Sequence, residues 1–115
     1  MLLEDAEAVL SIWPDAGGLG ELAVGVVGPY PAGAECAVEV RAFVGDLGVA
    51  EDPVTGSLNA GVAQWLIGQS ILPPSYVASQ GTALGRRGRV HIDAVDGTIW
   101  VGGATSTTIT GSVSF

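Results

Sequence analysis

The fold is decided by the stretch Glu51-Asp52-Pro53-Val54-Thr55-Gly56-Ser57-Leu58-Asn59-Ala60-Gly61-Val62-Ala63-Gln64-Trp65-Leu66-Ile67-Gly68-Gln69. Asp, Thr and Ser favour the position just before a helix, and Pro is compatible with its first turn. Few polar side chains follow these residues. The pattern therefore predicts a helix that starts at Asp52 and runs to the end of the stretch.

This predicted helix is apolar on nearly all sides. Its polar exceptions are Asn59, Gln64 and Gln69. One face carries, at helical spacing, the residues Leu58, Val62, Trp65 and Leu66. Such a helix is expected in the middle of a domain. Its buried start would need caps, water or a ligand for the free N–H groups, and its positive end favours an anion.

The segments on either side of this helix predict strands and one short outer helix. The outer helix is expected over 4–13, and strands over 22–27, 36–44, 76–79, 90–94, 98–101 and 107–115. In 36–44, apolar residues alternate with Glu39 and Arg41, which predicts a half-buried strand. Asp96-Gly97 is a strong hairpin signal. The expected fold is α+β: one domain over 1–115, with an antiparallel-rich mixed sheet curled around a central buried helix.

Composition excludes several functions. Twelve acidic residues stand against four arginines, a formal charge of −8, so nucleic acid and membrane surfaces are not expected partners. No apolar run approaches the roughly 20 residues that a bilayer requires, and no signal peptide is visible. The lone Cys36 fits a reducing cytoplasm, and a small buried residue is favoured there over a reactive thiol. We therefore expect a cytoplasmic protein.

The remaining polar residues give weaker signals. Arg86, Arg87 and Arg89 cluster where an anion would be welcome, although a solvated loop is the commoner interpretation. His91 alternates with apolar neighbours, which favours a solvent-facing strand position over a catalytic base. No His, Cys or carboxylate cluster has metal-ligand spacing, so no metal site is predicted.

The motifs together resemble a known family. They are Arg41-Ala42-Phe43, Gly48-Val49-Ala50 followed by the run Glu51 to Ser57, then Gln80-Gly81, Gly85-Arg86 and Val101-Gly102-Gly103. This succession is similar to the C-terminal half of phenazine biosynthesis PhzF-like proteins, which have the diaminopimelate epimerase-like fold. The resemblance covers nearly the whole chain. It implies two similar halves with an active site in the cleft between them.

The resemblance also implies site residues and a chemistry. Asp52 and Ser57 match catalytic positions, and the implied substrate-binding residues are Glu51, Thr55, Gly56 and Arg86. The reaction is a proton shift on a small carboxylated metabolite, without metal or organic cofactor. Fixed N–H donors at a helix start and nearby hydroxyls suit the negative charge that forms. The residues alone leave a second interpretation open, in which Asp52, Thr55 and Ser57 only cap the helix.

The family's N-terminal half, with its general acid/base glutamate, has no counterpart in this sequence. Three hypotheses follow. An isomerase-type domain would work after pairing, as a homodimer or with a separate N-terminal-half chain. A non-catalytic module would bind a small carboxylate at the same helix start. A truncated remnant of a longer enzyme would do neither.

Overall fold

The computed structural model describes residues 1–14, 22–44 and 51–115. The predicted turn at 15–20 and the loop at 45–50 lie outside these residues. The described elements are α1 (Ala6–Leu10), β1 (Ala23–Pro29), β2 (Val38–Val44), β3 (Glu51–Asp52), α3 (Gly56–Gly68), β4 (Ser75–Gln80), the 3-10 turn η1 (Thr82–Leu84), β5 (Gly88–Val95) and β6 (Thr98–Gly102).

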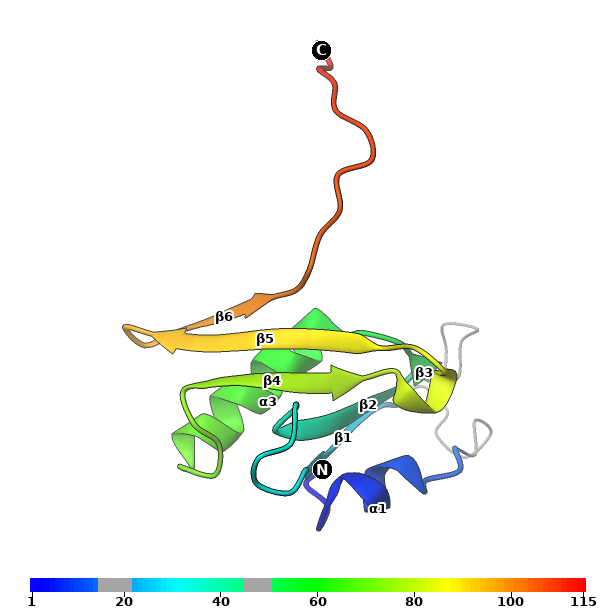
Figure 1. Cartoon of the computed structure of the whole chain (residues 1–115), viewed down its shortest axis with the longest axis vertical. Helices are drawn as coiled ribbons and strands as arrows, with labels where there is room; N and C mark the ends of the chain where they lie inside the picture. Colours follow the sequence, from blue (N-terminus) through cyan, green and yellow to red (C-terminus); the bar gives the residue numbers. More distant parts are fainter. Residues whose placement is uncertain (15–21, 45–50) are drawn as a thin grey trace.

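The described strands form one six-stranded mixed sheet (Figure 1). Its order is β1-β2-β4-β5-β6, with the short β3 beside β2. β2 and β4 are parallel, with Val38 opposite Ala78, whereas the other pairs are antiparallel. A parallel pair requires a crossover connection, and α3 lies within it. The predicted α+β fold with an antiparallel-rich mixed sheet is confirmed.

Helix α3 packs on one face of the sheet and α1 on the other. The α3 side contains the larger core, in which Val62 and Leu66 meet Val40, Ala78 and Ile92. The α1 side contains a smaller cluster, formed by the buried residues Val9, Val26 and Phe43. The sheet is therefore covered on both faces near β1 and β2.

This double cover corrects the prediction of a half-buried strand over 36–44. Every residue of β2 is buried except Val44, which is half-buried. Glu39 and Arg41 lie on the α1 face and are buried with polar partners, Glu39 with the hydroxyl of Tyr30 and Arg41 with Glu51. In β2, the polar residues face α1, the apolar residues that alternate with them face α3, and neither face of the strand is open to solvent.

Helix α3 is buried on one face only, which corrects the prediction of a helix surrounded on all sides. Gly61 and Gln64 are exposed, and Trp65 is 45% exposed. Among the described residues, the sheet ends at β6 and does not pass round to this side. The predicted sheet therefore curls only part of the way around its helix.

Two predicted elements differ in extent from the structure. The outer helix is shorter than 4–13: Asp5 caps it by accepting from the N–H of Ala8 at 2.7 Å, and Trp13 lies beyond it, exposed. The predicted strand at 107–115 is absent, since residues 103–115 belong to no strand and are exposed. No helix in the described part of the chain has the length and apolar character needed to cross a membrane.

Candidate functional site

The candidate site is the turn that joins β3 to α3. Glu51 and Asp52 pair with Phe43 and Ala42 of β2, so both residues are strand and not helix. Thr55 is the N-cap residue, with an extended backbone, and α3 begins at Gly56. The predicted helix start at Asp52 was four residues too early, because pairing with β2 outweighs the local capping preference.

The Asp52 carboxylate is held by the hydroxyl of Thr55. Thr55 Oγ1 donates to Asp52 Oδ2 at 2.6 Å. The Thr55 side chain makes no capping hydrogen bond to the helix, so this hydroxyl serves the carboxylate instead of the free N–H groups. The interpretation in which Thr55 acts as a side-chain cap is therefore wrong. The start of α3 keeps the free N–H groups that favour an anion.

Gln80 connects this turn to β4 and is fully buried. Its Nε2 donates to the carbonyl of Asp52 at 3.0 Å and to Thr55 Oγ1 at 3.1 Å. Its Oε1 accepts from the N–H of Thr55 at 3.0 Å and from Asn59 Nδ2 at 2.8 Å. Because one amide makes four contacts, Gln80 fixes the backbone that carries Asp52.

Asn59 and Gln80 were not predicted as site residues. Asn59 is fully buried on α3, and its Nδ2 also donates to the carbonyl of Thr55 at 2.9 Å. Two signals were present in the sequence: a polar residue in a mostly apolar helix, and the Gln80-Gly81 pair among the motifs. A buried side-chain amide requires partners, and the turn before α3 provides them.

Two hollows adjoin the start of α3. One, of about 400 Å³, has Thr55, Ser57 and Leu58 on one side; its other walls are Ala23, Val24, Gly25, Ala42, Phe43 and Val44. The other, of about 630 Å³, runs along the exposed side of α3 toward the β5–β6 hairpin and also includes Ser57. Ser57 is exposed, and a side chain added at Gly56 would meet open space. The helix start is thus accessible to a small molecule.

The loop that carries Arg86 packs against the same turn. Arg86 N–H donates to the carbonyl of Gly81 at 2.9 Å and closes the loop. Gly81 has φ +88°, and a Cβ there would lie 2.7 Å from the carbonyl oxygen of Pro53. The exposed Arg86 is thereby held near the turn that carries Asp52.

Glu51, predicted to bind substrate, is buried in an ion pair. Its two carboxylate oxygens accept from Nε and Nη2 of Arg41 at 2.9 and 2.7 Å, and Glu51 is 3% exposed. Nη1 of Arg41 also donates to the carbonyls of Val9 and Ile12. The Glu51 oxygens are therefore occupied, and the residue anchors β3 and α1.

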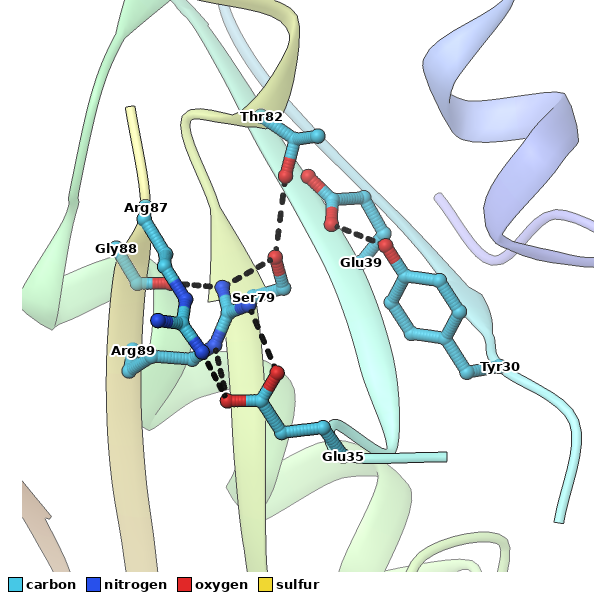
Figure 2. Close-up of polar contacts among 8 residues, drawn as sticks. All are labelled: Tyr30, Glu35, Glu39, Ser79, Thr82, Arg87, Gly88 and Arg89. Carbon is cyan, nitrogen blue, oxygen red and sulfur yellow. Dashed lines mark hydrogen bonds and ion pairs between the residues drawn. The ribbon is translucent and has the colours of Figure 1, made fainter. Parts of the chain in front are cut away.

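The other two arginines of the cluster are paired on the opposite face of the sheet from α3 (Figure 2). Arg87 and Arg89 both donate to the exposed carboxylate of Glu35, Arg87 at 2.9 Å, and Arg89 also donates to Ser79 Oγ at 3.1 Å. The hydrogen bond from Arg89 holds the pKa of Glu35 below its ordinary value, helped by the charges of both arginines. Glu35 thus neutralises part of the positive charge that was expected to attract an anion to this arginine cluster.

Two single-residue predictions on this face are confirmed. Cys36 is buried, and burial is the main cause that raises the pKa of its thiol. His91 is exposed on β5. Within the described ranges, no group of three or more His, Cys, Asp or Glu side chains could hold a metal ion.

Fold and site together define the class. The mixed sheet with a helix in its parallel crossover matches the fold of PhzF-family structures, which is diaminopimelate epimerase-like. The chain belongs to the PhzC-PhzF family, described as phenazine biosynthesis-like protein, which matches residues 1–113. The family predicted from the motifs is confirmed.

Known proteins align with this chain over only part of their own length. An uncharacterized isomerase, YddE of Escherichia coli K12, is 37% identical over 57 residues, which cover 45% of this chain and 19% of YddE. A PhzF-family protein of Enterococcus faecalis has a TM-score of 0.66 at 25% identity, covering 87% of this chain and 40% of that one. A phenazine biosynthesis PhzC/PhzF protein of Clostridium difficile strain 630 shares the fold, with a TM-score of 0.64 at 20% identity, covering 95% and 44%. The chain thus spans less than half the length of these relatives.

Proposed function

We propose that this chain is an isomerase-type domain that catalyses a cofactor-independent proton shift on a small carboxylated metabolite. The observation that carries the proposal is the Asp52 carboxylate, fixed through Thr55 beside an accessible helix start. Membership of the PhzC-PhzF family supports the same reaction class. The cytoplasmic location belongs to this proposal and is supported by the lone buried Cys36.

Each predicted residue has a distinct role in this proposal. Asp52 moves the proton, since one of its oxygens is held by Thr55 and the other makes no hydrogen bond within the described residues. Ser57 and the N–H groups at the start of α3, including that of Gly56, hold the substrate carboxylate. Arg86 adds a positive charge on the neighbouring loop. Glu51 is a positioning residue, because its ion pair with Arg41 fixes β3 and hence Asp52.

The domain works as a pair in this proposal. We infer that residues 1–115 correspond to the C-terminal half of a family member, so these residues form one wall of the cleft and the facing wall belongs to a second half or copy. The limited coverage of the relatives supports this inference. A homodimer is the simplest arrangement, since two-fold pairing covers the same surface on both copies. A separate N-terminal-half chain is the other arrangement.

The test is proton exchange in heavy water. The 115-residue chain is incubated with the common L-amino acids, and deuterium at the α-carbon is followed by NMR. Asp52→Asn should reduce the exchange rate at least about 100-fold, the usual contribution of a general acid/base group. Asp96→Asn, at an exposed hairpin position, is the matched control and should exchange at the wild-type rate. Equal rates for Asp52→Asn and wild type would remove Asp52 from the mechanism.

The free start of α3 also favours a second function, a non-catalytic module that binds a carboxylate. This function predicts saturable binding of the same L-amino acids, weakened by Ser57→Ala, without deuterium incorporation. A truncated remnant predicts neither binding nor exchange. Calorimetric titration beside the exchange measurement separates the three.

A further inference from the structure

Glu39 is a buried carboxylate that lacks a basic partner. It lies on β2, fully buried, and its Oε2 accepts from the hydroxyl of Tyr30 at 2.8 Å. Its Oε1 makes no hydrogen bond within the described residues. A carboxylate that is taken out of water needs hydrogen bonds and a compensating charge. One oxygen of Glu39 therefore needs a donor that the described residues do not supply.

The basic side chains of the molecule are engaged elsewhere. The chain has four arginines and no lysine, and all four arginines lie within the described residues. Arg41, two positions further along β2, is held by Glu51, and the two arginines of Figure 2 are held by Glu35. None of the salt bridges in the described part of the chain includes Glu39. Its counter-charge therefore has to come from outside these residues.

A small hollow adjoins Glu39 on the face of the sheet away from α3. Its volume is about 180 Å³, and its walls are Tyr30, Ala34, Glu35, Cys36, Ser79 and Arg89. Tyr30 is the hydrogen-bond partner of Glu39, and Ser79 is its register partner on β4. Figure 2 shows the carboxylate of Glu39 on the same side of the sheet as the hydroxyls of Tyr30 and Ser79. The unpartnered oxygen therefore lies behind the inner wall of the hollow.

We propose that this hollow binds a small primary ammonium ion, which donates hydrogen bonds to Oε1 of Glu39 and to the hydroxyl oxygens of Tyr30 and Ser79. A primary ammonium group has three N–H donors, one for each acceptor, and it supplies the missing positive charge. Tyr30 is half-buried, and a small movement of its ring opens the carboxylate to the hollow. Sites for drug-sized ligands have roughly 300–1,000 Å³, so the ligand of this smaller hollow is a small amine.

The surroundings of the hollow suit a cation. Nη1 of Arg89 donates to Ser79 Oγ at 3.1 Å, and Thr82 Oγ1 lies 3.1 Å from the same oxygen, so the Ser79 hydroxyl is held in place. Glu35 offsets the charge of Arg89 at the mouth of the hollow. The formal charge of −8 also attracts cations to the molecule. Because the hollow and α3 lie on opposite faces of the sheet, the inference does not depend on the proposed function.

The test is a titration of the isotope-labelled full chain with methylammonium chloride at constant ionic strength, followed by amide chemical shifts. Saturable shifts are expected at Tyr30, Glu39 and Ser79, with a dissociation constant in the millimolar range for so small an ion. Tetramethylammonium chloride is the matched control, because this ion has the same charge and no N–H donor, and it should give no saturable shift. Shifts that do not saturate, or equal responses to the two ions, overturn the inference.

Variants locate the ion within the molecule. Glu39→Gln removes the charge and should weaken methylammonium binding at least about 10-fold. Glu4→Gln removes the same charge at an exposed position and should bind as wild type does. Tyr30→Phe removes one acceptor at a half-buried position and should weaken binding several-fold, which keeps a readout if Glu39→Gln does not fold. Wild-type affinity in Glu39→Gln or in Tyr30→Phe overturns the inference.

Discussion

At the scale of single residues, the site depends on polar groups that satisfy one another inside the molecule. Gln80 makes four hydrogen bonds while fully buried, and Arg41 makes two to Glu51 and two to backbone carbonyls. Removing one member leaves the others unpaired away from water, which costs more than the bond contributed. Neither residue has to touch substrate to affect the site.

Replacing Gln80 by Leu should lower the free energy of unfolding by about 3 kcal/mol, since Asn59 Nδ2 and the Thr55 N–H lose their acceptor. Urea denaturation of the variant measures this change. Gln64→Leu makes the same substitution on the exposed side of α3 and should stay within about 0.5 kcal/mol of wild type. Similar losses of unfolding free energy in the two variants would mean that the hydrogen bonds of Gln80 stabilise the fold no more than an exposed glutamine does.

Replacing Glu51 by Gln should cost about 3–5 kcal/mol, because the Arg41 charge is left buried without its partner. Thermal unfolding followed by circular dichroism gives the comparison. The control Glu35→Gln breaks an exposed contact with Arg87 and Arg89 and should barely move the midpoint. Equal shifts would argue that burial of the Arg41–Glu51 pair has no energetic consequence.

The two tyrosines provide a prediction about pH. Burial, and for Tyr30 also its hydrogen bond to Glu39, raises the pKa of Tyr30 and Tyr76 to about 12, against an ordinary value of 10. The folded state therefore keeps protons that the unfolded state has lost between these pH values. The contribution of the two tyrosines to the free energy of unfolding is therefore fully present below about pH 10, and it is lost as the pH rises from about 10 to 12. Ultraviolet absorbance should show little phenolate at pH 10, and half-ionisation there would contradict the burial of both rings.

At the scale of elements, backbone contacts decide where α3 begins and how its neighbouring loop fits. The η1 loop approaches Pro53 so closely that Gly81 has no room for a side chain, and its φ is positive. Gly85 in the same loop also has a positive φ but faces open space. A side chain at Gly85 would cause backbone strain alone, whereas one at Gly81 would cause the same strain and a steric clash with Pro53.

Gly81→Ala and Gly85→Ala should each lower the free energy of unfolding by about 1–3 kcal/mol, because alanine is strained in the left-handed backbone conformation of both positions. Only Gly81→Ala should also displace Pro53 and the Asp52 carboxylate, so it should slow proton exchange while Gly85→Ala does not. Unfolding curves and exchange rates for the pair of variants test this. Equal exchange rates in both variants would show that the loop does not position Asp52.

Sequence predicted the elements better than their edges and partners. Apolar spacing and the flanking capping residues predicted the helix now seen as α3, and Asp96-Gly97 predicted the β5–β6 hairpin. Local preference could not predict that Glu51 and Asp52 pair with β2, so the helix start was misplaced. Nor could it predict that 103–115 belong to no strand, since an alternating pattern forms a strand only when the chain pairs with a neighbouring strand. Gln80 was missed as a site residue because its role depends on contacts across 25 residues.

At the scale of the whole molecule, the described residues leave surfaces open on one side, along α3 and β6. The exposed side of α3, the edge of β6 and the apolar residues of 105–115 are all surfaces that a folded domain normally buries. The open hollow at Ser57 continues along the same side. The proposed function, in which a second half or copy faces this side, accounts for these features together.

The most direct test of this account is the exchange rate per chain measured across a concentration series that spans dissociation of the pair. Light scattering on the same samples gives the paired fraction. We predict that deuterium incorporation per chain rises in proportion to the paired fraction and disappears in the Asp52→Asn variant at every concentration. An exchange rate per chain that stays constant where the protein is a single chain would contradict the claim that the site needs two chains.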